Sequence, residues 1–112
     1  MRVFSDHPRF SGGERGFVPG RREALRLRLV LYCERHIRNR RAPAPARLDR
    51  RFTAFFTAAR RQGYIGAAAD PATLAHLFIA LLAGLDLRRC GGALPHDLRR
   101  MAAEMIRLII AD

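Results

Sequence analysis

The chain of 112 residues has no lysine and no tryptophan, and it has few serines and cysteines. All 21 of its basic residues are arginine, which we interpret as the mark of a GC-rich coding sequence rather than of selection for guanidinium chemistry. Serine occurs only at Ser5 and Ser11, no nucleophile is set beside a base in the sequence, and no glycine-rich phosphate loop is present. We therefore expect the protein not to be an enzyme and to need no cofactor.

The two cysteines, Cys33 and Cys90, lie far apart in a chain that has no apolar signal segment. This pattern predicts reduced, unpaired thiols in a cytoplasmic protein. Cys33 and His36 have the spacing of two metal ligands on a helix, but no second pair has suitable spacing, so no metal site is expected.

The longest apolar stretch, 74–87, is interrupted by His76 and Asp86 and predicts no bilayer-spanning segment and no membrane partner.

Positive charge is concentrated in the first half of the chain. Residues 1–51 contain 14 arginines against 5 acidic residues, whereas residues 52–112 contain 7 against 5. This half either binds phosphate backbones nonspecifically or is solvated and poorly ordered. Residues 1–20 are rich in glycine and proline, which predicts an irregular basic arm.

The rest of the chain predicts an all-α fold, a small helical bundle with helices at about 21–41, 47–62, 71–89 and 95–110. The first segment also alternates leucine with other residues as a strand does, but its leucine and arginine content favours helix. The second is amphipathic and is followed by Gly63, a typical residue just after a helix end. The third begins at Asp70-Pro71, an N-cap followed by proline in the first turn.

The third helix is apolar nearly all round, and a short Gly-Gly link predicts that it packs antiparallel to the fourth. Each helix can bury only one side against the other, so a second copy is expected to complete a four-helix bundle. In the alternative interpretation, the same residues pack within the hydrophobic core of a monomer. The expected interface is formed by Ile79, Ala80, Ala83, Gly84, Leu87, Met101, Met105, Ile106 and Ile109.

The run FTAFFTAARRQGYIGAAADPATLAHLFIALLAGLDLRR, residues 52–89, resembles the C-terminal half of TetR-family transcriptional regulators. The likeness consists of a helix that ends in a basic residue and glycine, then Asp-Pro, then a long helix with Leu74-Ala75 and Ala80 to Leu85, and a closing amphipathic helix. It extends over residues 48–112 and is weak over 21–41. In that family the last two helices form the dimer bundle, and the preceding helices line a pocket for a small, usually apolar effector.

The resemblance implies a ligand pocket formed by Phe52, Phe55, Phe56, Tyr64, His76 and Phe78, although the aromatic residues also fit a plain core. Asp86 is expected to pair with Arg89 or with an arginine of a partner copy. The helix-turn-helix domain of the family is missing, so specific DNA binding is not expected. The sequence therefore predicts an effector-binding and dimerisation module; the alternatives are a small nucleic-acid-binding protein using residues 21–51, or a truncated gene fragment.

Overall fold

The computed structural model describes residues 20–39 and 45–111, and these residues form four helices and no strand. The helices are α1 (Gly20–Arg38), α2 (Pro45–Arg61), α3 (Pro71–Cys90) and α4 (Pro95–Ile109). The prediction of an all-α bundle is confirmed, and the helix option for the first segment is the correct one. The predicted arm at residues 1–20 falls almost entirely outside the described part of the chain.

The helix boundaries lie close to those predicted, and local chemistry explains them. Asp70 is the N-cap of α3, with Pro71 at the first helical position, and its carboxylate accepts a hydrogen bond from the Thr73 hydroxyl. At the end of α2, Gly63 adopts a φ of 80°. Its amide and that of Tyr64 bond back to the carbonyls of Arg60 and Ala59, which closes the helix in a Schellman motif. The first helix ends at Arg38, earlier than the expected 41.

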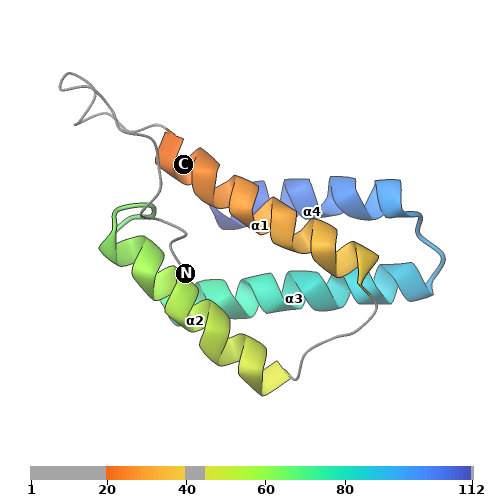
Figure 1. The fold of residues 1–112 in the computed structure, drawn as a ribbon, viewed down its shortest axis with the longest axis horizontal. Helices are drawn as coiled ribbons and strands as arrows, with labels where there is room; N and C mark the ends of the chain where they lie inside the picture. The colour runs from red at the N-terminus through yellow and green to blue at the C-terminus, as the bar shows by residue number, and fades with distance from the viewer. Residues whose placement is uncertain (1–19, 40–44, 112) are drawn as a thin grey trace.

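Helix α3 is the centre of the bundle (Figure 1). It packs against α2 on one side and antiparallel to α4 on the other, and α1 lies across α4 and also contacts α3. By length and composition alone α3 is long and apolar enough to cross a membrane, contrary to the expectation that no segment is. Its contacts with three other helices account for the apolar residues on its inner sides, whereas only a third of its most apolar stretch is buried within the chain.

The alternation of leucines in α1 has a structural explanation. Leu25 and Leu29 are buried, whereas Leu27 and Leu31 point away from the core with exposed fractions of 57% and 52%. Residues four apart share one side of a helix, so the alternating pattern gives α1 two leucine pairs on opposite sides. The pattern that resembled a strand is therefore produced by a helix with one apolar side in the core and another in solvent.

Candidate dimerisation surface

The predicted interface residues of α3 are mostly on the surface of the chain. Ala80, Ala83 and Leu87 are exposed, and Leu87 has an exposed fraction of 73%. Gly84, between them, faces open space, because a methyl group built on its Cα meets no atom within 4 Å. These small side chains would let the backbone of another helix approach closely. They form an unpartnered apolar strip along α3.

A second apolar strip runs along α4. Met105 is exposed and Met101 is half-buried, at the spacing that places both on one side of the helix. Leu108 completes the strip, one turn beyond Met105, and has an exposed fraction of 74%. The predicted interface omitted Leu108, although its spacing from Met101 and Met105 was a sufficient signal.

The two strips lie on the side of the α3–α4 hairpin that faces away from α1. Arg89 of α3 and Arg99 of α4 both reach back to α1, where they bond to the Ile37 carbonyl and to Glu34. Leu87 and Leu108 lie on the opposite sides of their helices from these arginines, as the helical repeat requires. The side of the hairpin that no described helix covers is thus its apolar side.

Three residues of the predicted interface lie deeper than expected. Ile106 has an exposed fraction of 1% and is part of the core, so its inclusion in a surface was wrong. Its position one turn after Ala102 places it on the side of α4 that packs inward. Ile79 and Ile109 are half-buried and pack against the core, so they border the surface rather than form it.

The aromatic residues of the expected ligand pocket pack against one another. Phe52, Phe56, Tyr64 and Phe78 are buried, and Phe55 is half-buried. The ring centroids of Phe52 and Phe78 are 4.8 Å apart, and Tyr32 lies edge-on to Phe52 at 5.0 Å. This aromatic cluster, Tyr32, Phe52, Phe55, Phe56 and Phe78, joins α1, α2 and α3. Tyr64 lies in the core separately, with Arg21 over its ring.

His76, which the resemblance also assigned to that pocket, is on the surface. Its Nε2 lies 3.3 Å from the carboxylate of Asp49 in α2, and both side chains are substantially exposed. The structure does not bring His76 together with the buried aromatic rings.

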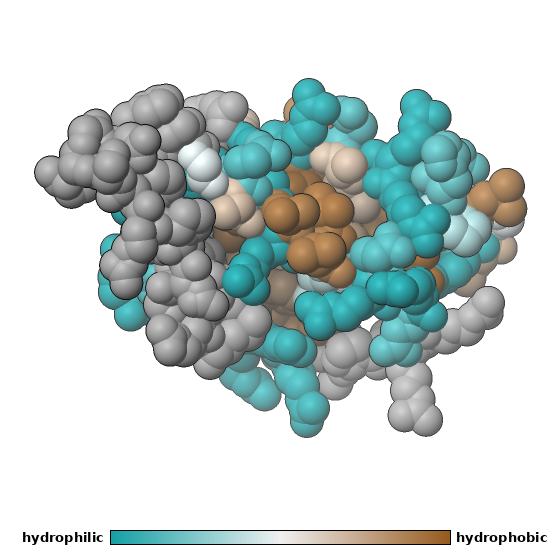
Figure 2. Space-filling view, turned by 45° about the horizontal axis from the view of Figure 1, so that its top comes forward, coloured by the Kyte–Doolittle hydropathy of each residue, from teal (hydrophilic) through white to brown (hydrophobic). Residues whose placement is uncertain are grey.

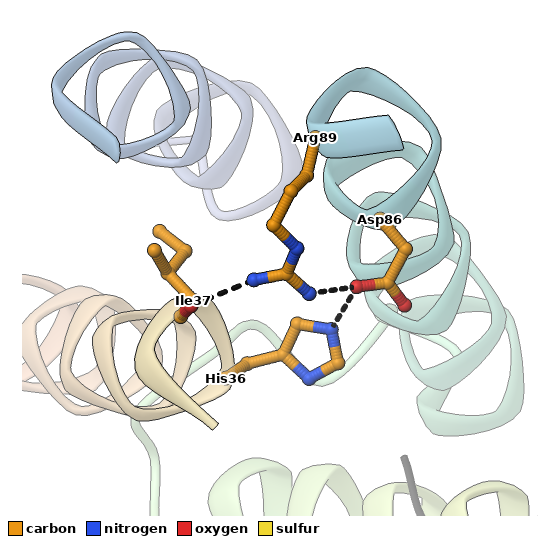
Figure 3. A network of polar contacts seen from close by, with 4 residues as sticks. All are labelled: His36, Ile37, Asp86 and Arg89. Carbon is orange, nitrogen blue, oxygen red and sulfur yellow. Dashed lines mark hydrogen bonds and ion pairs between the residues drawn. The ribbon is translucent and has the colours of Figure 1, made fainter. Parts of the chain in front are cut away.

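A polar network joins the end of α1 to the end of α3 (Figure 3). One carboxylate oxygen of Asp86 lies 2.7 Å from an Arg89 guanidinium nitrogen and 3.0 Å from His36 Nε2. The other terminal nitrogen of Arg89 donates to the carbonyl of Ile37, at 2.6 Å. The predicted pairing of Asp86 with Arg89 is confirmed, but sequence reasoning missed His36 because it lies 50 positions away along the chain.

Replacing Asp86 with alanine should lower the free energy of unfolding by about 1–3 kcal/mol, since the substitution removes the acceptor shared by two donors of low exposure. Urea titration followed by circular dichroism measures the effect. Glu104→Ala is the matched control, because its contact with Arg107 is long, at 3.4 Å, and both side chains are exposed. Its expected cost is below about 0.5 kcal/mol. Equal losses in the two variants would show that the Asp86 network does not stabilise the fold.

The two cysteines are free and differ in environment. Burial raises the pKa of the Cys33 thiol to about 12, whereas Cys90 is exposed at the end of α3. No group of three potential metal ligands occurs among the described residues, and Cys33 lies in the core.

In the folded protein we expect only Cys90 to react quickly with a thiol reagent such as dithionitrobenzoate, because the thiolate is the reacting species and Cys33 is buried. Denaturant should then release the second thiol. Cys90→Ser should abolish the fast phase. A fast phase that persists in Cys90→Ser would mean that α1 opens readily.

Several arginines bond to the carboxyl ends of helices, a role that the composition did not indicate. Such contacts satisfy carbonyls that the helix leaves unpaired. They are Arg21 to the Gln62 carbonyl at 3.2 Å, Arg22 to Ala111 at 2.7 Å, Arg26 to Ile110 at 2.9 Å, and Arg89 to Ile37 at 2.6 Å. Three of the four belong to the basic segment 21–51, so part of its charge stabilises the fold.

Comparisons with known proteins identify no relative of this chain. No family model, no curated protein and no solved structure matches this chain. The likeness to TetR-family regulators therefore depends on the residues of α2, α3 and α4 alone.

Proposed function

We propose that this chain is a homodimerisation module, built as the C-terminal half of a TetR-like regulator is built. The observation that carries the proposal is the pair of uncovered apolar strips on α3 and α4, which we call the hairpin surface: Ala80, Ala83, Gly84, Leu87, Met101, Met105 and Leu108.

A second copy is the occupant that best fits the hairpin surface. Two antiparallel helices meeting the same two helices of a partner form a four-helix bundle, which is the common way to cover such a pair. A two-fold interface uses the same patch twice, so one surface of small and large apolar residues suffices. Ala80, Ala83 and Gly84 allow close backbone approach, while Leu87 and Leu108 supply the buried area.

Dimerisation of the native chain is tested by sedimentation equilibrium. We expect a dimer at tens of micromolar, roughly the range in which modest interfaces associate. A monomer throughout that range would contradict the proposal.

Effector binding is a further proposal that depends on the family resemblance. The rings of the aromatic cluster fill the space between α1, α2 and α3. A small apolar compound would therefore have to separate these rings in order to bind among them. Thermal unfolding in the presence of a panel of apolar compounds tests it, because a ligand that binds only the folded state raises the transition temperature. Specific DNA recognition is not part of the proposal.

A further inference from the structure

The outward side of α1 carries an exposed leucine pair that neither the core nor the hairpin surface explains. Leu27 and Leu31 are more than half exposed, at 57% and 52%, and lie one helical turn apart. In Figure 1 α1 crosses in front of α4. Figure 2, turned by 45° from that view, shows hydrophobic residues gathered near the middle of the face with hydrophilic residues around them.

The charged groups beside this leucine pair are predominantly basic. Arg28, Arg35 and Arg38 are exposed on the same helix. Arg28 and Arg35 form no ion pair with any residue in the described part of the chain. We call Leu27, Leu31, Arg28, Arg35 and Arg38 the α1 ridge.

The carboxylates nearest the α1 ridge are already neutralised. Glu34 receives two hydrogen bonds from Arg99, at 2.7 and 2.9 Å, and lies 3.6 Å from Arg38. The hydrogen bond from Arg99 is the main reason that the pKa of Glu34 is lowered. Glu23 lies 2.7 Å from Arg26. The ridge therefore presents apolar side chains within a field of positive charge.

The combination of exposed leucines and unneutralised arginines distinguishes between the possible binding partners of the α1 ridge. A second copy of the ridge would bring arginines against arginines. A nucleic acid would neutralise the arginines but would place the leucines against phosphates and water. An anionic bilayer satisfies both groups, because arginines contact lipid phosphates while adjacent apolar side chains enter the headgroup region. The two leucines lie on one exposed side of a helix, an arrangement that fits a flat lipid surface.

We propose that the α1 ridge docks the protein on the surface of an anionic membrane. Leu27 and Leu31 enter the interfacial region, and Arg28, Arg35 and Arg38 bind the phosphates of the lipid headgroups. The contact is peripheral and uses a different helix face from the hairpin surface, so it does not depend on dimerisation.

The test is co-sedimentation of the full chain with vesicles. Vesicles containing phosphatidylserine in phosphatidylcholine should bind the protein, and vesicles of phosphatidylcholine alone should not. Arg28→Gln/Arg35→Gln should weaken binding roughly 25-fold, since each basic residue near an anionic surface contributes about a fivefold factor. Leu27→Gln/Leu31→Gln should weaken it about tenfold, through the lost apolar contact.

Matched controls separate the ridge from general charge. Arg88→Gln/Arg100→Gln removes the same charge from exposed positions on α3 and α4, and Leu94→Gln removes an exposed leucine from the link between them. Both control variants should bind within about threefold of the native chain, since neither changes the ridge. Equal loss in the two arginine double variants would overturn the proposal, as would unchanged binding by the Leu27/Leu31 double variant.

The absence of tryptophan supplies a second readout. Leu31→Trp should show a blue-shifted emission spectrum on addition of phosphatidylserine vesicles, whereas Leu94→Trp should not shift, since only the first side chain enters the interface. No retention on phosphatidylserine vesicles at low salt overturns the proposal, even if the same face binds an acidic peptide or DNA.

Discussion

Replacing Leu87 and Leu108 together with aspartate is expected to convert the proposed dimer of this chain to a monomer. Both side chains are about three-quarters exposed in the single chain, at 73% and 74%, so the substitutions remove almost no core contact. In a two-fold interface each copy contributes both positions, and four carboxylates would enter the apolar seam. We expect the dissociation constant to rise about 100-fold or more, because like charges juxtaposed across an interface cost several kcal/mol.

Sedimentation equilibrium measures this change, and far-ultraviolet circular dichroism verifies that the variant remains helical. Leu27→Asp/Leu31→Asp is the matched control, since it introduces the same charges at exposed leucines on the opposite side of the bundle. That variant should retain the association of the native chain. If it dissociates and the Leu87/Leu108 variant does not, α1 and not the hairpin forms the interface.

The helices and much of the candidate surface were predictable because the signals are local. Asp70 and Pro71 mark the start of α3 through chemistry within one turn, and Gly63 marks the end of α2 through its own backbone conformation. The exposed positions on α3 were predictable because this helix carries more apolar residues than one neighbouring helix can bury. Ala80, Ala83 and Leu87 were identified in this way, and the structure places them on the surface.

The remaining features depend on contacts between helices, which periodicity does not contain. Ile106 shares the side of α4 that carries Ala102, and the contacts of α4 with α1 and α3 decide that this side is the buried one. The bonds from Arg22 and Arg26 to the end of α4 join residues more than 80 positions apart. No local pattern indicates that an arginine will bond to a distant carbonyl and not to a phosphate.

The role of the aromatic cluster can be decided by stability measurements. A side chain that fills the core leaves a cavity when truncated, whereas one that lines an existing pocket leaves only a larger pocket and costs less. Phe78 is fully buried, with its ring centroid 4.8 Å from that of Phe52 and 5.9 Å from that of Tyr32. These contacts favour the core interpretation over the pocket implied by the family resemblance.

Phe78→Ala should therefore lower the free energy of unfolding by about 3–5 kcal/mol, a large share of the 5–15 kcal/mol typical of a domain. Urea titration at one fixed protein concentration measures the loss, because the proposed dimerisation would also contribute to stability. Leu94→Ala, at a mostly exposed leucine, should cost less than about 0.5 kcal/mol. A loss below about 1 kcal/mol in Phe78→Ala would instead favour an effector pocket, because truncating the wall of an existing cavity removes few contacts.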